Sequence, residues 1–555
     1  MIRACLAVVA CLGLAASAGA QTVGSSQPAP ADPTVPRPGT TPCVVQLYSG
    51  YTFADFSPKP FTYTPPAACP GPWAKVVLEA DFSCTAGRQF DRTAQIAINH
   101  VNVYYGTTAE PSAAVSPAWH VERDLTDYSS LFTTIQSGEV SLGNLVNSTF
   151  TGILYGDARL LFYPPSAAAP APRTSDAVLS LSTAPGGAAL LQTGSDVLAA
   201  TFSLPANVEA AYVDVVPQSQ SADEFWYTCV PDDVANEVFS CGGTAFREAE
   251  VTVDGQPAGV APVYPWIYTG GIDPLLWRPI PGVQTFNFVP YRVDLTPFAG
   301  LLSNGQPHQV GVSVYNANHY FLVAASLLIY QDHGSAQVTG AVTRNTLGSV
   351  PAPSIQENLT TAADGTVTGT ISTRQERSFE LAGYVNTSHG RVETTVRQEL
   401  SFSNQQSFLV SDTQYVQKIE QGTEIESNVD SKSPGSVAHS EKHLSYPLTL
   451  DFTFLANADG SGAQTTSVAQ EFDSQEALGG NAVDSGMTRV SNAVSSKDTL
   501  LFNASGAVTG FQDRNSSQTY VGRGSGGACY SKTVTSANGV VTGVVAGQGC
   551  GNRGH

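Results

Sequence analysis

Charge is scarce in this sequence, and most of the charge present is negative. Of the 555 residues, 26 are Lys or Arg and 46 are Asp or Glu, which gives a formal net charge of −20. Binding to a phosphate backbone needs clustered Lys and Arg, so this shortage argues against nucleic acid as a partner.

Long apolar runs are scarce too. Nothing after residue 20 is apolar for long enough to span a bilayer, so we expect no membrane partner.

Clustered metal ligands are also lacking. No Cys-x-x-Cys pair occurs anywhere in the chain, so the sequence gives no support for a zinc site. We therefore expect neither a metal nor a cofactor.

The first 20 residues have the layout of a secretory signal. Arg3 is followed by an apolar stretch over residues 6–16 and by the small residues Ala-Gly-Ala at 18–20, which predict cleavage before Gln21. We therefore expect a secreted protein, extracellular or periplasmic. Residues 8–11, Val-Val-Ala-Cys, also resemble a lipoprotein site. Cleavage there would leave a very short apolar region, so free secretion is preferred.

Removal of the signal leaves seven cysteines, and export favours disulfides. Proximity in the sequence suggests three pairs and leaves Cys84 over, which we interpret as a small buried thiol. The predicted pairs are Cys43 with Cys69, Cys229 with Cys241, and Cys529 with Cys550.

Short runs of alternating apolar and polar residues dominate the chain and predict an all-β fold. Residues 94–98 and 310–314 are examples, and long helical periodicity is absent. Pro-rich or small-residue stretches at 21–42, 164–175 and 334–354 indicate linkers. The predicted architecture is two adjacent jelly-roll or β-sandwich domains, at 43–165 and 176–333, followed by a C-terminal β-sandwich domain at 355–555. We expect a ligand cleft where the first two domains meet.

Three segments place acids, arginines and aromatic residues side by side, where such groups are costly to bury unless they are paired or used. They are residues 89–92 (Gln-Phe-Asp-Arg), 223–227 (Asp-Glu-Phe-Trp-Tyr) and 270–279 (Gly-Gly-Ile-Asp-Pro-Leu-Leu-Trp-Arg-Pro). Together they resemble the peptide-N4-(N-acetyl-β-glucosaminyl)asparagine amidase A (PNGase A) family. The resemblance covers most of the chain after the signal, including residues 108–111.

The resemblance implies a cofactor-free amidase acting on N-glycosylated peptides and glycoproteins. Such an enzyme hydrolyses the β-aspartylglucosylamine bond, releases the glycan and converts Asn to Asp. The reaction needs an activated water, stabilisation of the oxyanion and protonation of the leaving nitrogen, all of which carboxylates and an Arg can supply.

Asp91 and Glu224 are the two catalytic residues that the resemblance implies. The more distant PNGase F family carries its essential Asp in a similar aromatic-Asp-Arg setting, which Asp91 matches. The same family uses a Glu beside a Trp, for which Glu224 with Trp226 is the nearest equivalent. From spacing alone, the alternative role of Asp91 is an internal salt bridge with Arg92.

Eight further residues are candidates for substrate binding, because acids hydrogen-bond sugar hydroxyls and aromatic rings stack on sugar faces. They are Arg92, Asp223, Trp226, Arg247, Glu248, Asp273, Trp277 and Arg278. Structural roles remain open for several of them. Arg247 could pair with a neighbouring acid, Trp277 could fill an interdomain core, and Arg278 could pair with Asp273. Glu248 is also the rival of Glu224 as the second catalytic acid.

Two other classes of function could use the same residues. A non-catalytic glycan-binding β-sandwich protein would only hold sugar with these acids and tryptophans. A glycosidase with a carboxylate pair would cut between sugars instead. The products from one glycopeptide separate the three functions. Asp in the peptide indicates the amidase, a retained N-acetylglucosamine indicates the glycosidase, and an unchanged glycopeptide indicates the binder.

Overall fold

The computed structural model describes residues 22–348, 350–481 and 485–550. The predicted signal at 1–20 therefore lies outside the described residues. Within them the chain is built almost entirely of antiparallel strands, and the predicted all-β class is confirmed. Among the described residues, no helix has the length and apolar character needed to cross a membrane.

The first sandwich consists of two four-stranded sheets, ordered β1-β8-β3-β6 and β2-β7-β4-β5. Side chains alternate between core and surface along its strands, as in β8, and Phe53, Ile96 and Phe162 are among its fully buried residues. The elements are β1 (Cys43–Phe53), β2 (Lys59–Tyr63), β3 (Lys75–Cys84), β4 (Thr93–Ile98), β5 (Val101–Thr107), β6 (Ala118–Asp124), η1 (Thr126–Phe132), β7 (Gln136–Ser141) and β8 (Leu154–Tyr163).

The second sandwich packs the sheet β10-β17-β12-β15, to which β9 is added, against the sheet β11-β16-β13-β14. Its strands are β9 (Ala177–Ser180), β10 (Ala188–Leu191), β11 (Val197–Ser203), β12 (Val208–Gln220), β13 (Glu248–Val253), β14 (Gln256–Pro262), β15 (Tyr291–Asp294), β16 (Pro307–Tyr315) and β17 (Tyr320–Gln331). Its short helices are η2 (Pro185–Gly187), η3 (Ser221–Asp223), η4 (Trp226–Thr228), η5 (Thr296–Phe298) and α1 (Ala299–Leu302). The long connections 221–247 and 263–290 carry two of the three motif segments.

The C-terminal region forms one twelve-stranded sheet, where we expected a sandwich of its own. It begins at β18, inside the stretch 334–354 that we interpreted as a linker. Its strands are β18 (Thr339–Asn345), β19 (Ser354–Thr361), β20 (Val367–Thr387), β21 (Gly390–Val410), β22 (Gln414–Ser433), β23 (Ser436–Ser445), β24 (Leu448–Ala456), β25 (Gly462–Gly480), β26 (Gly486–Phe502), β27 (Val508–Arg523), β28 (Cys529–Ala537) and β29 (Val540–Ala546).

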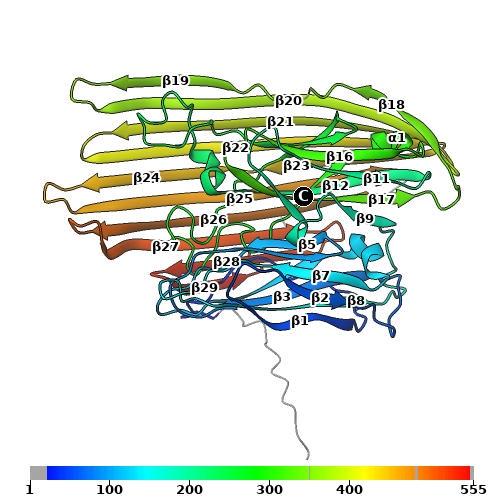
Figure 1. Cartoon of the computed structure of the whole chain (residues 1–555), viewed down its shortest axis with the longest axis horizontal. Helices are drawn as coiled ribbons and strands as arrows, with labels where there is room; N and C mark the ends of the chain where they lie inside the picture. Colours follow the sequence, from blue (N-terminus) through cyan, green and yellow to red (C-terminus); the bar gives the residue numbers. More distant parts are fainter. Residues whose placement is uncertain (1–21, 349, 482–484, 551–555) are drawn as a thin grey trace, which may run out of the picture.

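The second sandwich is the layer that covers one face of this large sheet. Figure 1 shows it lying across the long strands, with the first sandwich at the bottom of the view. One hydrophobic core joins the two parts, and the Phe402 ring of the sheet lies 5.1 Å from Phe246 and 6.3 Å from Trp226, centroid to centroid. The sheet therefore has no separate core there, because its apolar residues pack into the core of the second sandwich.

The buried face of the sheet also carries amide side chains, which hold the long connections of the second sandwich. Each donates a hydrogen bond to a loop carbonyl. The pairs are Asn404 with Tyr227 (2.9 Å), Gln406 with Cys229 (2.9 Å), Gln417 with Thr228 (3.2 Å) and Gln470 with Pro265 (2.6 Å). The sheet thus fixes loop backbone with polar contacts and apolar packing together.

The segment 22–42, expected to be a Pro-rich linker, is packed against the body of the molecule although it contains no strand. The Gly24 N–H donates to the Val541 carbonyl in β29 (2.8 Å), and the Ala29 N–H donates to the Pro279 carbonyl (2.9 Å). Ala31 is fully buried, and its N–H donates to Gln518 Oε1 (2.7 Å). We call residues 22–32 the N-terminal strap.

All three predicted disulfides are present: Cys43–Cys69, Cys229–Cys241 and Cys529–Cys550. Cys84 is free and buried. Burial raises the pKa of its thiol to about 12, which keeps the group neutral and unreactive at physiological pH.

Candidate active site

Two carboxylates of the first sandwich approach Gly270, at the start of the 270–279 loop between β14 and β15 of the second sandwich. Asp91 precedes β4 and Glu110 follows β5 in the first sandwich. The Gly270 N–H donates to Asp91 Oδ2 at 3.2 Å. A Cβ atom added to Gly270 would lie 2.8 Å from Asp91 Oδ1 and 2.6 Å from Glu110 Oε2. A side chain at this point would displace one or both carboxylates, so glycine is what lets them approach the loop backbone this closely.

Glu224 contributes a third carboxylate from the second sandwich, directly after η3. Burial, together with the negative charge of Asp91, raises the pKa of Glu224 to about 7, so the two carboxyl groups interact electrostatically. Burial also raises the pKa of Asp91, against the hydrogen bond from Gly270 and the charges of Arg92 and Arg278. Carboxyl groups shifted in this way are typical of catalytic sites.

Arg278 pairs with Glu110 rather than with Asp273. Its Nη2 donates to Glu110 Oε1 at 2.9 Å and to the Pro111 carbonyl at 3.0 Å. Burial raises the pKa of Glu110 to about 7, with Arg278 opposing the shift and Asp91 adding to it. The second oxygen of Glu110, Oε2, is buried and has no hydrogen-bond partner in the described structure. The pair is therefore incompletely satisfied.

Glu110 is the functional candidate that sequence reasoning missed. It lies in the segment 108–111 that carries part of the family resemblance, but no acid or arginine stands beside it in the sequence to mark it. Its partners come from residues more than 150 positions away, such as Arg278 and Thr269, whose Oγ1 accepts a hydrogen bond from the Glu110 N–H (3.0 Å). A signal based on spacing could not reveal it.

Arg92 lies beside this cluster without forming the salt bridge with Asp91 that spacing favoured. Within the described residues its Nη2 donates to Gln89 Oε1 (2.7 Å), and its backbone N–H donates to Thr108 Oγ1 (2.9 Å). The charges of Arg92 and Asp91 still interact. Arg92 thus adds positive charge to the site while Asp91 keeps its oxygens for other partners.

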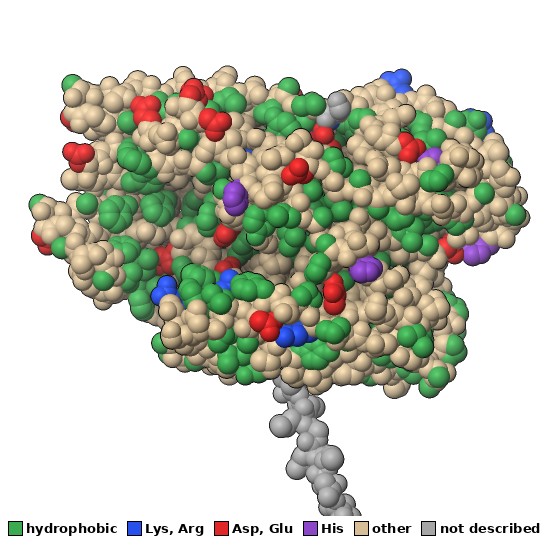
Figure 2. Space-filling model, viewed as in Figure 1, with side chains coloured by type: hydrophobic (Ala, Val, Ile, Leu, Met, Phe, Trp, Pro, Cys, Tyr) green, Lys and Arg blue, Asp and Glu red, His purple; other side chains and the backbone are tan. Residues whose placement is uncertain are grey.

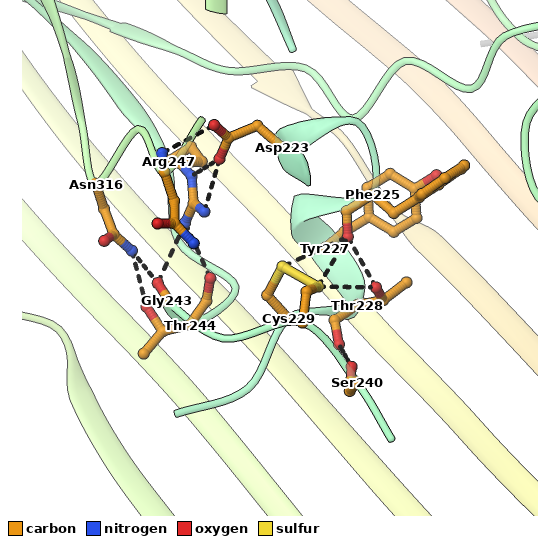
Figure 3. The surroundings of a disulfide bond; sticks show 12 residues. Asp223, Phe225, Tyr227, Thr228, Cys229, Ser240, Gly243, Thr244, Arg247 and Asn316 are labelled. Atoms are coloured by element: carbon orange, nitrogen blue, oxygen red, sulfur yellow. Dashed lines mark hydrogen bonds and ion pairs between the residues drawn. A yellow bond between two sulfur atoms is a disulfide. The ribbon is translucent and has the colours of Figure 1, made fainter. Parts of the chain in front are cut away.

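Asp223 and Arg247 form a closed ion pair, for which we had expected a role in substrate binding. Both side chains are completely buried; the Arg247 Nε and Nη2 donate to Asp223 Oδ1 at 3.1 and 2.9 Å, and the Asn318 N–H donates to Oδ2 at 2.8 Å. Figure 3 shows the pair beside the Cys229–Cys241 disulfide. Trp226 is also buried, in the core shared with the sheet. These three residues hold the 221–247 connection in place and present no surface to a ligand in this structure.

Glu248, the rival of Glu224, faces the large sheet. It is fully buried and paired with Arg377, which also contacts Glu250 at 3.0 Å. Burial raises the pKa of Glu248 to about 7, and Arg377 opposes the shift. Its charge partners are Arg377 and Glu250 and not Asp91, so the structure places Glu224, rather than Glu248, with the carboxylate cluster.

Asp273 and Trp277 are buried parts of the 270–279 loop. Trp277 Nε1 donates to the Gly271 carbonyl at 2.8 Å, which closes the loop on itself, and the side chain lies in the core shared with the large sheet, as the structural alternative proposed. Asp273 Oδ1 accepts the Leu275 N–H at 2.9 Å, and the carboxyl faces Asp498 of β26. Burial and the Asp273 charge raise the pKa of Asp498 to about 7. Both residues shape the loop from inside.

A cavity of about 220 Å³ adjoins the cluster, with Glu110 and Arg278 in its wall. The remaining walls include Ser26 and Pro28 of the strap, Trp277 of the loop, and Arg514 of β27. All parts of the fold therefore contribute to this one space. Figure 2 shows the surface hollowed along the junction between the first sandwich and the rest of the molecule, with acidic side chains in the hollow.

Two clusters elsewhere have the composition of a metal site: Glu79, His120 and Glu122, and Glu209, Asp332 and His389. Arginines already neutralise several of these carboxylates. Arg37 bridges Glu79 and Glu122 at 2.5 and 2.7 Å, and Arg173 pairs with Glu209. A cation would have to displace these arginines, so ion pairing accounts for both clusters.

Two β-sandwiches that meet at carboxylates with raised pKa values and an arginine define a site suited to acid–base hydrolysis. Comparison with known proteins then gives the family. The model of peptide N-acetyl-β-D-glucosaminyl asparaginase amidase A matches residues 29–347, and that of the PNGase A C-terminal domain matches residues 370–448. The chain belongs to the PNGase A family.

A curated relative supports the same family over almost the whole chain. Peptide-N4-(N-acetyl-β-glucosaminyl)asparagine amidase A of Prunus dulcis is 30% identical over 525 residues, which cover 90% of this chain and 89% of the relative. Among solved structures, PNGase F of Flavobacterium meningosepticum is 12% identical with a TM-score of 0.35, covering 52% of this chain and 96% of its own. PNGF-II is 10% identical with a TM-score of 0.36, covering 52% and 66%.

Proposed function

We propose that the protein is a peptide-N4-(N-acetyl-β-glucosaminyl)asparagine amidase that releases N-glycans from glycopeptides and glycoproteins. The observation that carries the proposal is the approach of Asp91 and Glu110 to Gly270, with Arg278 paired to Glu110 and Glu224 interacting with the charge of Asp91, in a chain of the PNGase A family. Two carboxyl groups with pKa values of about 7 can exchange protons with a substrate near neutral pH.

In the proposed reaction, water attacks the side-chain carbonyl carbon of the glycosylated Asn. A C–O bond forms, the amide C–N bond between that carbonyl carbon and the nitrogen breaks, and the nitrogen leaves on the sugar after it gains a proton. Asp91 accepts the proton of the water, and Glu224 protonates the nitrogen. Arg278, positioned against Glu110, places positive charge near the developing oxyanion. The products are an Asp residue and a glycosylamine.

Digestion of one purified glycopeptide, followed by mass spectrometry, tests the proposal. We expect a peptide with Asp in place of the glycosylated Asn. In heavy-oxygen water, the label should enter the new Asp carboxyl. A peptide that retains N-acetylglucosamine would instead indicate a glycosidase. Binding without any product would indicate a glycan-binding protein.

We also propose that the protein acts outside the cytoplasm. The layout of residues 1–20 and the three disulfides support export. Expression in a secreting host, with N-terminal sequencing of the protein in the medium or periplasm, is the test. We expect the exported protein to begin at Gln21. A protein that stays inside the cell with residues 1–20 still attached would contradict export.

A further inference from the structure

The large C-terminal sheet contacts the 270–279 loop through side chains of β26 and β27. Three carbonyl groups of the loop accept hydrogen bonds from these side chains. Arg514 Nε donates to the Leu275 carbonyl (3.0 Å), Arg514 Nη2 donates to the Arg278 carbonyl (2.9 Å), and Ser496 Oγ donates to the Leu276 carbonyl (2.6 Å). Arg278 is the same residue whose side chain pairs with Glu110. One arginine therefore fixes the backbone of another that lies in the candidate site.

The strands are shaped for this contact by a β-bulge. Lys497 pairs with Asn515 and Thr499 pairs with Gln512, so Asp498 of β26 lies opposite both Asp513 and Arg514 of β27. Asp513 has a φ of 53°, in the left-handed region that non-glycine residues seldom adopt. Bulges of this kind redirect side chains out of the regular alternation. Here the result is that Asp498 and Arg514 both face the loop.

The position of Arg514 brings its charge close to the charge of Arg278, so close packing of side chains does not by itself explain an arginine here. The guanidinium of Arg278 lies close enough to lower the pKa of Arg514, in addition to the effect of burial, while Asp498 and Asp273 raise it. Two like charges brought together cost free energy. A neutral amide would avoid this cost, but its single NH₂ group cannot span both carbonyls as the guanidinium does. Arg514 also lines the cavity that contains Glu110 and Arg278.

We propose that Arg514 is a positioning residue for the reaction: its planar fork of donors spans the Leu275 and Arg278 carbonyls and so sets where the Arg278 side chain meets Glu110. The proposal rests on the proposed amidase function. It assigns part of the active-site geometry to the C-terminal sheet. Lys cannot replace this fork, because an ammonium is a point charge and cannot span two carbonyls in a fixed plane.

Kinetics on one glycopeptide provide the first test. Misplacement of a catalytic group by a fraction of an ångström to one ångström lowers turnover strongly, so we expect Arg514→Gln to lower kcat by about 10- to 100-fold. KM should change by less than about threefold. Arg514→Lys should restore only part of the loss. Arg523→Gln is the matched control, because Arg523 lies on the same strand and donates to a carbonyl, that of Gly549 (2.6 Å), away from the loop.

A double-mutant comparison separates positioning from direct contact with substrate. If Arg514 acts through Arg278, then Arg514→Gln should have little further effect in a protein that already carries Arg278→Gln. Full additivity of the two losses, or an unchanged kcat in Arg514→Gln, would overturn the proposal. Titration of Glu110 gives a second sign. Arg278 lowers the pKa of Glu110, so loosening Arg278 should raise that pKa, which NMR of the carboxyl group measures in Arg514→Gln.

Hydrogen exchange tests whether Arg514 holds the loop backbone, and this test does not depend on measurable enzyme activity. In Arg514→Gln, the amides of residues 271–278 should exchange at least about tenfold faster than in the wild type, while Arg523→Gln leaves them unchanged. Unaltered exchange in the loop would contradict the positioning role. A wild-type protein that cleaves no glycopeptide would refute the amidase function, and the exchange result would still test Arg514.

Discussion

Two clusters of acidic residues and arginines in this molecule contain the same residue types, but they differ in how completely their carboxylate oxygens are hydrogen-bonded. In the first, Asp223 and Arg247 are completely buried, and both carboxylate oxygens are hydrogen-bonded. In the second, around Gly270, Glu110 keeps a buried oxygen without a partner, although Arg278 pairs with its other oxygen. The comparison indicates that residue type alone does not mark a site. What distinguishes the second group is that its unsatisfied carboxyl, with a raised pKa, also lies in the wall of a cavity.

The sharpest way to break this comparison is to remove the charge of Asp91. We expect Asp91→Asn to lower kcat by at least about a hundredfold, because the amide cannot accept the proton of the attacking water. Burial raises the Asp91 pKa, so the charged form is the disfavoured one and its loss should not lower Tm. Glycopeptide turnover and thermal unfolding measured on the same sample check both parts. Near-normal turnover would remove Asp91 from the mechanism.

The second prediction removes a charge from the buried ion pair of Asp223 and Arg247. Asp223→Asn leaves the Arg247 charge buried and without its carboxylate, which should destabilise the fold by about 3–5 kcal/mol. Denaturant unfolding measures this loss. The variant that remains folded should keep its KM, because the pair exposes no surface to substrate. A stable Asp223→Asn protein with a raised KM would instead support the original expectation of substrate binding.

Glu224 tests whether a raised pKa marks a proton donor. We expect Glu224→Gln to lower kcat by about 100-fold with little change in KM, since proton donation matters only as the amide breaks. A donor with a pKa of about 7 loses its proton as pH rises, so wild-type kcat should fall above about pH 7. That fall should be absent in the variant. An effect on KM alone would make Glu224 a sugar-holding residue.

The smallest expected effect concerns Asp498, which faces Asp273 behind the loop. Its folded-state pKa is raised from 3.8 to about 7, so the stability linked to its protonation is present below pH 4 and is lost as pH rises through about 7. Asp498→Asn cannot ionise, so it should gain on the order of 1–3 kcal/mol over wild type at pH 8 and much less at pH 5. Tm measured against pH checks this. An equal difference at both pH values would show that ionisation of Asp498 is not the cause.

Sequence patterns predicted the strands, both sandwiches and all three disulfides, because alternation and cysteine proximity are local. The family resemblance implied Asp91 and Glu224 as catalytic residues, and the 270–279 motif made Arg278 a candidate for substrate binding. Sequence patterns failed where the deciding partner is distant. Glu110 is identified by Arg278, and the place of Asp223 is decided by Arg247 and Asn318.

The large sheet shows a second reason for failure. Asn404, Gln406 and Gln470 are polar residues on strands, so the sequence predicts that they face water. In the structure they are buried, and each bonds to a loop carbonyl. An argument based on apolar periodicity cannot distinguish such a face from an exposed one. This is why the C-terminal region was expected to fold as a separate sandwich.

The N-terminal strap has a consequence for the order in which the molecule is made. Its Ala31 N–H bonds to Gln518, 487 residues further along, and Gly24 bonds to Val541 of the last strand. Translation therefore makes these two partners of the strap only near the end of synthesis, although the Pro279 carbonyl, which accepts the Ala29 N–H, is made earlier. The cavity beside Glu110, which the strap helps to wall, cannot close on a nascent or shortened polypeptide. Completion of the cavity thus depends on synthesis of the last strands of the chain.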